Sequence, residues 1–325
     1  MPVLLTEKDV RAVLTMDDLI AAMEAALVAF CTGAAVQPLR TVVDAGGRGL
    51  FGVMPAYMGA RDALGAKLVT VFPGNRQAGL PTHLATIVLL DPATGALVAL
   101  VDGRYITEAR TAAVSAVSVT LLARDDASTL AIIGAGVQGR SHLQAITRVR
   151  NIRDVRVWSP AERSRSSFVR DMQPETAARI ATAASARDAV EGADIVVLAT
   201  AAREPVVRSD WIADGAHVCA VGACRPDERE MDSALVTRAK LFVDSRAGAT
   251  SEAGDVIIPI KEGAFDASHI AGELGEVAAG MRPGRTSPGE VTIFKSLGIA
   301  VEDVAAAHLA FTKASERGLG RGFVL

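Results

Sequence analysis

Cysteine, histidine and long apolar segments are all scarce in this chain of 325 residues. The three cysteines, Cys31, Cys219 and Cys224, form no Cys-x-x-Cys pair, which is typical of a protein of the reduced cytoplasm. The five histidines are scattered without metal-ligand spacing, so no metal site is expected. Serine and threonine interrupt the longest apolar segment, at 112–122, so the chain lacks the roughly 18 consecutive apolar residues of a membrane span.

Two further absences narrow the class of protein. The formal net charge of −3 lacks the basic excess by which proteins bind nucleic acids, so no nucleic-acid partner is expected. The first residues have neither the basic start nor the apolar core of a signal peptide, which again favours a cytoplasmic location. What is present is a chain with 50% hydrophobic residues, long enough to fold into two domains.

The most informative motif is Gly134-x-Gly136-x-x-Gly139. In such a turn the first glycine permits a sharp bend from strand to helix, the second lets a pyrophosphate approach the backbone, and the third lets the helix pack on the strand. The helix that follows directs unpaired N–H groups and its positive dipole end toward the phosphates. The sequence therefore predicts a dinucleotide site with cofactor contacts at Gly134, Gly136, Val137, Gln138 and Gly139.

The residues around the motif fit this interpretation. A buried strand is predicted at 129–133 and an amphipathic helix at 138–149, and the next strand, at 155–158, lies where a βαβ unit requires it. Further strands separated by helical stretches are predicted at 180–183, 195–199, 218–221, 241–243 and 291–294. This alternation predicts a doubly wound parallel sheet of the Rossmann type, which binds ligands at the carboxyl ends of its strands. The candidates at those ends are Thr200, Val221 and Gly222.

The residues before 123 have a different pattern. Two helices are predicted after the N-caps Thr6 and Thr15, each of which has an acid three residues later. Short β-branched strands follow at 41–43, 50–54, 66–72, 84–90 and 97–101, and the last two form a hairpin. A helix at 106–123 leads into the dinucleotide domain, and the chain ends with a helix at 299–316 and a strand at 322–325. An antiparallel sheet with helices is therefore expected in the first domain.

Six ordered stretches together match one family. They lie at 64–75, 79–83, 102–113, 134–139, 222–232 and 294–303. On these motifs the chain resembles the ornithine cyclodeaminase/mu-crystallin family over nearly its whole length. The resemblance implies an NAD(P)-dependent α/β enzyme in which 123–298 form the Rossmann domain. Residues 1–122 and 299–325 would form an α+β domain that binds the substrate and makes a homodimer.

Three cations match the substrate-carboxylate clamp of the family, namely Arg40, Lys67 and Arg110. Two guanidinium forks and an ammonium suit the carboxylate of an amino or imino acid. Each could instead be an ordinary surface cation, but Lys67 lies in an apolar strand, where a lone charge needs a partner or a purpose. Burial beside two arginines would also lower the pKa of Lys67, so we assign it a catalytic, proton-handling role.

The second catalytic candidate is Cys224. The cyclodeaminases of the family have a catalytic aspartate at this position, and a thiol that is mostly protonated at neutral pH is a poor substitute. Mu-crystallin-like ketimine reductases have a small non-acidic residue there, so Cys224 favours imine reduction over deamination, although it could be only a wall residue. Thr82 and His83 match the segment that approaches the nicotinamide; Thr82 is assigned to the cofactor, and His83 is either a proton donor or structural.

The choice of cofactor depends on the residues after the second strand. Ser159 stands where an NAD enzyme usually has an acid, and Arg163 is close enough in sequence to bind a 2′-phosphate. NADP(H) is therefore favoured, and NAD(H) stays possible because Glu162 could reach a ribose. Two further acids, Glu252 and Asp255, either border the active site or cap the next helix.

The sequence thus predicts NAD(P)H-dependent reduction of a small cyclic ketimine acid to the L-amino acid. Δ1-Pyrroline-2-carboxylate and its six-membered homologue are the expected substrates. Three alternatives stay open: an ornithine cyclodeaminase that forms proline and ammonia, an alanine-dehydrogenase-like amino acid dehydrogenase, and a non-catalytic NADP-dependent ligand-binding protein.

Overall fold

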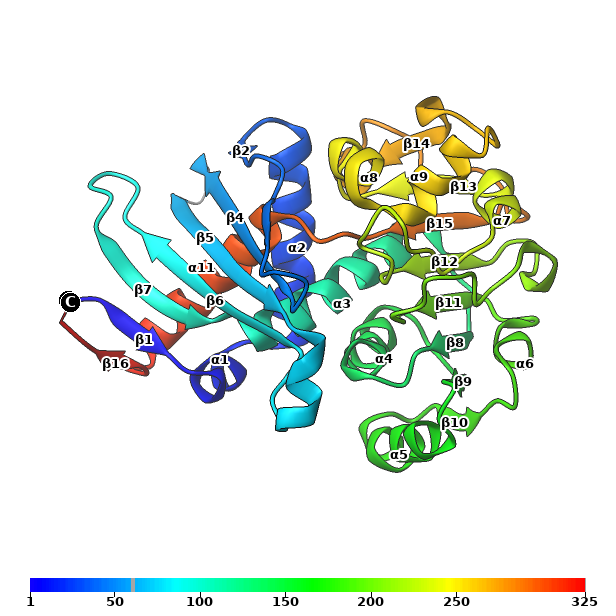
Figure 1. Ribbon diagram of the computed structural model, residues 1–325, viewed down its shortest axis with the longest axis horizontal. Helices are drawn as coiled ribbons and strands as arrows, with labels where there is room; N and C mark the ends of the chain where they lie inside the picture. Colours follow the sequence, from blue (N-terminus) through cyan, green and yellow to red (C-terminus); the bar gives the residue numbers. More distant parts are fainter. Residues whose placement is uncertain (60–61, 325) are drawn as a thin grey trace. The chain divides into compact units, whose positions relative to one another are not determined.

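The computed structural model describes residues 1–59 and 62–324, which form two compact units (Figure 1). Unit 1 consists of Met1–Arg110 with Ile299–Leu325, and unit 2 is Thr111–Gly298. The two units divide at 110/111, within the single helix α3 (Gly103–Leu122), whereas the boundary predicted from sequence is at 122/123, the end of that helix. Residues 111–122 belong to unit 2 because Ser115 and Ser118 are hydrogen-bonded to His142 and His217 of that unit.

Unit 1 is built on one sheet whose strand order is β16-β1-β7-β6-β5-β4-β2, with β3 paired to β4. The strands β4 to β7 pair antiparallel, as predicted, but β1 joins β7 in parallel, so the sheet is mixed. The bounds are β1 Val3–Leu5, β2 Ala35–Val36, β3 Thr41–Asp44, β4 Leu50–Met58, β5 Ala63–Val71, β6 His83–Leu90, β7 Leu97–Asp102 and β16 Arg321–Gly322. Of the strand predicted at 322–325, only Gly322 is a strand residue, and 325 lies outside the described residues.

Three helices cover one face of this sheet. They are α1 (Glu7–Val13), α2 (Met16–Cys31) and α11 (Ala300–Glu316), and η2 (Pro73–Ala78) is a short 3-10 segment between β5 and β6. The predicted caps are confirmed, because the side chains of Thr6 and Thr15 accept hydrogen bonds from the backbone N–H groups of Asp9 and Asp18. Helix α11 packs along β4, β5 and β6, so the end of the chain completes the core of unit 1 (Figure 1).

Unit 2 is a parallel sheet with the order β10-β9-β8-β11-β12-β15-β13-β14, which confirms the predicted α/β class. The strands are β8 Thr129–Ile133, β9 Asp154–Trp158, β10 Arg179–Thr182, β11 Ile195–Leu198, β12 His217–Ala220, β13 Lys240–Val243, β14 Ile270–Glu273 and β15 Thr292–Lys295. The chain runs outward from β8 in one direction through β9 and β10, then crosses back to β11. The order therefore reverses between β8 and β11, where open α/β sheets bind ligands.

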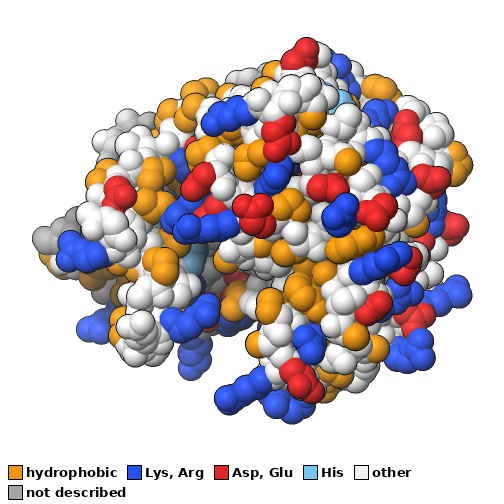
Figure 2. Space-filling view, turned by 45° about the vertical axis from the view of Figure 1, so that its right-hand side comes forward, with side chains coloured by type: hydrophobic (Ala, Val, Ile, Leu, Met, Phe, Trp, Pro, Cys, Tyr) orange, Lys and Arg blue, Asp and Glu red, His pale blue; other side chains and the backbone are white. Residues whose placement is uncertain are grey.

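Helices lie on both faces of this sheet and enclose two hydrophobic clusters. They are α4 Val137–Val149, α5 Glu162–Met172, α6 Ala186–Val190, α7 Ser233–Arg238, α8 Arg246–Glu252, α9 Gly254–Lys261 and α10 Leu274–Ala278, with 3-10 turns η3 Gln173–Glu175, η4 Ser209–Trp211 and η5 Ala267–His269. Within the described ranges, no helix has the length and hydropathy to span a bilayer. Acidic and basic side chains are interspersed on the face of the molecule shown in Figure 2.

Candidate active site

The glycine turn after β8 has the geometry that its sequence predicts. Gly134 has φ +116°, and a Cβ there would lie 2.3 Å from the carbonyl oxygen of Ala199. A Cβ on Gly139 would lie 2.1 Å from the carbonyl oxygen of Gly134, so helix α4 can pack this closely only with glycine there. At Gly136, by contrast, no atom lies within 4 Å of the Cβ position. This open space beside the backbone is what an approaching pyrophosphate needs.

The start of α4 offers unused polar groups beside that space. The helix begins at Val137, whose side chain is half exposed, and its first N–H groups have no partner within the helix. The Oε1 atom of Gln138 is buried and accepts no hydrogen bond from any described residue. Buried polar atoms are normally paired, so Gln138 fits a site whose partner is a ligand. The residues present therefore fit a dinucleotide.

The charged residues after the tip of β9 differ in their contacts, because Arg165 is bonded to the backbone whereas Glu162 and Arg163 are exposed. The backbone carbonyl of Ser159 accepts a hydrogen bond of 2.6 Å from Nη1 of Arg165, so this arginine secures the turn. The side chains of Glu162 and Arg163 are exposed at the start of α5. Arg163 is thus the basic side chain near Ser159 that is open to solvent.

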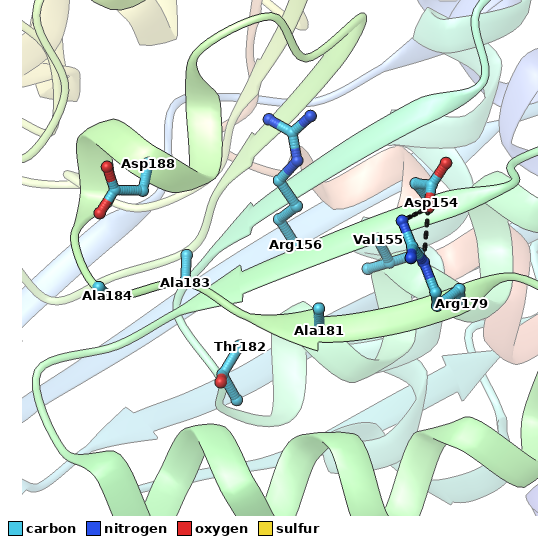
Figure 3. A pocket seen from close by; sticks show the side chains of 9 residues that line it. All are labelled: Asp154, Val155, Arg156, Arg179, Ala181, Thr182, Ala183, Ala184 and Asp188. Atoms are coloured by element: carbon cyan, nitrogen blue, oxygen red, sulfur yellow. Dashed lines mark hydrogen bonds and ion pairs between the residues drawn. The ribbon is translucent and has the colours of Figure 1, made fainter.

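A separate surface depression lies over the outer strands β9 and β10 (Figure 3). Its charged residues are engaged with the protein: Arg179 pairs with Asp154 at 2.8 Å, and Arg156 donates to the carbonyl of Glu191 at 2.6 Å. None of the site residues predicted from sequence lines this depression.

The carboxyl ends of β11 and β12 are joined by a residue that the sequence analysis missed, Glu230. Its Oε1 accepts hydrogen bonds from the N–H and the hydroxyl of Thr200, at 2.6 and 2.7 Å. Its Oε2 accepts the N–H of Gly222 at 2.7 Å, and Val221 is bonded to the carbonyl of Leu198 on β11. Two of the predicted cofactor residues, Thr200 and Gly222, are therefore brought together by one buried carboxylate.

Glu230 belongs to a buried cluster with Asp255 and Lys295, and the side chains of all three are fully buried. Asp255 accepts the backbone N–H of Glu230 at 2.8 Å and lies 3.1 Å from Nζ of Lys295, which also donates to the carbonyl of Gly222. Burial and the neighbouring Asp255 raise the pKa of Glu230 to about 7 against the opposing effect of Lys295. Asp255 thus neither caps its own helix nor lies at the surface. A signal for Lys295 was its place in an apolar strand, as for Lys67.

Cys224 lies just beyond this cluster, on the turn after β12. The preceding residue, Ala223, has φ +53°, a conformation that side chains other than glycine rarely adopt. Cys224 is exposed, with its Sγ 3.5 Å from the carbonyl of Val221. The other acid considered from sequence, Glu252, is half-buried at the end of α8.

Unit 1 contains a second buried cluster of charges, around Lys67 on β5. Nζ of Lys67 lies 2.6 Å from Oδ2 of Asp303. Arg110, on α3, contacts Oδ1 of Asp303 at 2.9 Å and Oε2 of Glu302 at 2.6 Å. The exposed fraction of these four side chains is at most 4%. Glu302 and Asp303 were not predicted from sequence; the signal was two adjacent acids in the first turn of a helix that is otherwise apolar there.

Burial and neighbouring charges lower the pKa of Lys67 and of the nearby His83. Burial, opposed by Asp303 and assisted by Arg110 and Arg40, lowers the pKa of Lys67 to about 8, in the direction predicted from sequence. Burial and the neighbouring cations Lys67 and Arg110 lower the pKa of His83, at the start of β6, to about 4. His83 is therefore neutral at pH 7 and is not a source of protons there.

The remaining predicted residues of unit 1 lie near the ends of strands. Arg40 is half-buried directly before β3, and it is close enough to Lys67 to affect the pKa of that lysine. Thr82 is half-buried directly before β6, where its carbonyl accepts the N–H of Phe72. The cluster therefore combines three cations, Arg40, Lys67 and Arg110, with two carboxylates.

Comparisons with known proteins agree with this architecture. The profile of the "Ornithine cyclodeaminase/mu-crystallin family" matches residues 1–318. Ketimine reductase mu-crystallin of Mus musculus is 42% identical over 297 residues, which are 90% of this chain and 91% of that protein. Two solved structures are also similar. The Δ1-pyrroline-2-carboxylate reductase of Thermococcus litoralis in complex with NADH and L-proline has a TM-score of 0.97 and 42% identity, covering 99% and 100% of the two chains. An archaeal alanine dehydrogenase dimer with bound NAD has a TM-score of 0.94 and 31% identity, covering 98% of each.

Proposed function

This chain belongs to the ornithine cyclodeaminase/mu-crystallin family, and we propose that it reduces a small cyclic ketimine acid to the L-amino acid with NAD(P)H. The substrate class is that of Δ1-pyrroline-2-carboxylate and its six-membered homologue. The observation that carries the proposal is the cluster at Lys67, where Lys67, Arg110 and Arg40 lie together with the buried carboxylates of Asp303 and Glu302. Two guanidinium groups and an ammonium together suit a carboxylate, which a substrate of this class carries.

The residues beside Lys67 favour an apolar ring over a second charged group. In the sheet, Lys67 lies directly opposite Met54 on β4 and Ile87 on β6, and both side chains are buried. Neither can bind the side-chain amine of a diamino acid. A cyclic imine, which has no such amine, is therefore the better match than ornithine.

The protein's own part in the reaction is to bind, orient and protonate. When bound, the nicotinamide cofactor supplies the hydride for the carbon of the C=N bond. Arg40, Lys67 and Arg110 hold the carboxylate and thereby fix the orientation of the imine. With its pKa near 8, Lys67 keeps the imine nitrogen protonated at neutral pH, so that the nitrogen keeps this proton in the amine product.

Cys224 distinguishes the proposed reaction from deamination. A cyclodeaminase needs a carboxylate that moves protons during loss of the amine, whereas an imine reductase does not, because its substrate is already an imine. We assign Cys224 to the wall of the site near the cofactor, at the exposed turn after β12. A thiol in this position is compatible with reduction and disfavours deamination.

For the cofactor we propose contacts at Gly134, Gly136, Val137, Gln138, Gly139, Thr200, Val221 and Gly222 in unit 2, with Thr82 from unit 1. NADP(H) is the favoured form, because Arg163 is exposed near Ser159 and no acid stands at the strand tip. NAD(H) is the second candidate, since the two similar solved structures contain NADH and NAD.

We further propose a homodimer formed through the face of the unit 1 sheet opposite α11. Antiparallel sheets that face water usually alternate apolar and polar residues along each strand. Here the residues of the outer face are also apolar and partly exposed, including Tyr57, Leu68, Leu84, Val88 and Leu100. The partner would be a second copy of this chain, as in the similar alanine dehydrogenase dimer. Replacement Leu68→Glu is expected to give monomers in light scattering; an unchanged mass would contradict this interface.

The test of the activity is a panel of substrates. The purified protein is incubated with NADPH or NADH and Δ1-pyrroline-2-carboxylate, with pyruvate plus ammonia, and, with catalytic NAD⁺, with ornithine. Consumption of the reduced cofactor with the cyclic imine is expected to be the fastest reaction. Faster turnover of pyruvate and ammonia would instead establish an alanine-dehydrogenase-like enzyme, and proline formed from ornithine without cofactor consumption would establish a cyclodeaminase. Ligand binding without any turnover would leave a binding protein.

A further inference from the structure

We infer that Glu230, Lys295 and Asp255 are positioning residues that set the geometry of the half of the cofactor site formed by β11 and β12. This inference rests on the proposed function, because it concerns the site for the nicotinamide cofactor. The three side chains are fully buried, so they act through the backbone of Thr200 and Gly222 and not by touching a ligand.

The carboxyl ends of β11 and β12 lie next to the glycine turn of the dinucleotide site. The pyrophosphate binds at the glycine turn after β8, and the residues after β9 bind the ribose of the adenosine half. A Cβ on Gly134 would lie 2.3 Å from the carbonyl of Ala199, so the turn directly adjoins the end of β11. The other half of the dinucleotide, which carries the nicotinamide, therefore extends along the ends of β11 and β12.

Glu230 fixes the spacing between the carboxyl ends of β11 and β12. The paired register of the strands stops at Leu198 and Ala220, and beyond it the backbone bonds between β11 and β12 are those from Val221 and Gly222 to the carbonyl of Leu198, among the described residues. One oxygen of Glu230 binds Thr200 after β11, and the other binds the N–H of Gly222 after β12. Glu230 also packs tightly, since a Cβ on Gly222 would lie 2.6 Å from its Cδ. The carboxylate thus bridges the two strand ends.

The peptide groups on either side of Gly222 are each held by a charged side chain. Glu230 accepts from the N–H of this residue, and Lys295 donates to its carbonyl, so opposite charges hold both of its polar groups. Asp255 in turn holds Lys295 and the backbone of Glu230. The next residue, Ala223, has φ +53°, which side chains other than glycine adopt only when their surroundings impose it. The cluster provides that constraint.

A carboxylate at the amino ends of the strands of the same sheet, Asp194, offers a matched control. Asp194 accepts the backbone N–H groups of Ser128 and Thr129, both at 2.9 Å, and pairs with Arg124. It therefore holds backbone in the manner of Glu230, but at the amino ends of β8 and β11. Replacement Asp194→Asn is expected to reduce stability without affecting the cofactor, whereas Glu230→Gln is expected to affect both.

The experiment compares these two variants in the full-length protein. Unfolding by urea gives the stability, calorimetry gives the Kd of NADPH and NADH, and steady-state kinetics give the KM of each substrate. Glu230→Gln replaces one acceptor by a donor that faces an N–H group. We expect its Kd for the preferred nucleotide to rise at least about tenfold, with the KM of the imine acid, whose ligands are in unit 1, within about twofold. Asp194→Asn should keep the nucleotide Kd within about twofold.

Two results would overturn the inference. One is a folded Glu230→Gln protein with the wild-type Kd, and the other is an equal rise of Kd in Asp194→Asn. If Glu230→Gln does not fold, Asp255→Asn replaces it, because the asparagine keeps the acceptor for Glu230 N–H and loses only the charge beside Lys295. A several-fold rise of the nucleotide Kd is expected in Asp255→Asn, and an unchanged Kd would contradict the inference. If the wild-type protein binds neither nucleotide, the proposed function itself is wrong.

Discussion

The two buried charge clusters of this protein contain the same kinds of residue in opposite proportions. In unit 1, Asp303 and Glu302 are surrounded by Lys67, Arg110 and Arg40, so cations are in excess. In unit 2, Glu230 and Asp255 surround a single Lys295, so carboxylates are in excess. Both lysines are buried, yet the pKa of Lys67 falls to about 8 while the pKa of Lys295 rises above its usual value.

The difference shows how burial and neighbours combine. Burial alone lowers the pKa of any lysine, because the charged form loses its hydration. At Lys295 the carboxylates Asp255 and Glu230 overcome this effect, whereas at Lys67 the cations Arg110 and Arg40 add to it. The sign of the charge that predominates in each cluster determines which groups the cluster can bind. The cation-rich cluster of unit 1 suits an anionic ligand, and the carboxylates of unit 2 accept N–H groups from the backbone.

The largest expected effect comes from removing the lysine of the cation-rich cluster. Replacement Lys67→Met deletes both a carboxylate ligand and the proton-handling group, so kcat/KM for the imine acid should fall about 10³-fold or more. Lys313, which pairs with Asp18 on α2, is the matched control in unit 1, and Lys313→Met should keep nearly full activity. A loss of less than about tenfold in Lys67→Met would show that the cluster is structural.

The glycine turn gives the next largest effect. Gly134→Ala places a Cβ 2.3 Å from the carbonyl of Ala199 in a backbone conformation of φ +116°, so the turn must shift. We expect weaker nucleotide binding by at least about tenfold in calorimetry and a lower midpoint of thermal unfolding. Gly192→Ala is the control, because it also has a positive φ but no atom within 4 Å. Equal nucleotide affinities of both variants and the wild type would contradict the role given to Gly134.

The pH dependence tests the electrostatics of the cation-rich cluster. Lys67 binds the carboxylate in its charged form, so activity should decline as the pH rises through about 8, the pKa of this lysine. Removing a neighbouring negative charge lowers the pKa of a cation. In Asp303→Asn the alkaline limb of kcat/KM should therefore move to lower pH. A limb that stays in place, or moves upward, would mean that another group titrates.

Buried histidines predict a smaller effect, on stability alone. Burial lowers the pKa values of His142 and His217 in unit 2 to about 4 and about 3. Between those values and the ordinary value of 6.5, only the unfolded chain binds the protons, so the free energy of unfolding should decrease as the pH falls from 6.5 toward 4. Urea unfolding at several pH values measures this slope. In His217→Asn the slope should be shallower, and an unchanged slope would assign it to other groups.

The smallest expected effect is at Cys224. Because the thiol of Cys224 transfers no proton in the proposed reaction, Cys224→Ser should change kcat by only about twofold. Cys224→Asp is the sharper variant, since it introduces the carboxylate of the cyclodeaminases. Ammonia released from ornithine by Cys224→Asp and not by the wild type would support the assignment. A large loss of imine reduction in Cys224→Ser would give the thiol a direct role.

The sequence was most informative where one local pattern determines the structure. The strands β8 and β9, the turn at Gly134 and the helix α11 follow from short-range periodicity and glycine spacing. The short strands β1 and β2 have too few residues to show any alternation. The ion pairs were not predictable in the same way, since Lys67 and Asp303 are 236 positions apart and meet only because α11 packs on β5. Glu230 was missed because its partners are backbone groups, which no side-chain pattern reveals.

The central claim is that the three cations of the unit 1 cluster, Arg40, Lys67 and Arg110, recognise the carboxylate of the substrate. It is tested most directly by comparing Δ1-pyrroline-2-carboxylate with 1-pyrroline, which has the same ring and imine but no carboxylate. The wild-type protein should reduce the acid with a kcat/KM at least about 100-fold higher, and Lys67→Met should lose most of that preference. Equal kcat/KM values for the two imines in the wild-type protein would contradict the claim.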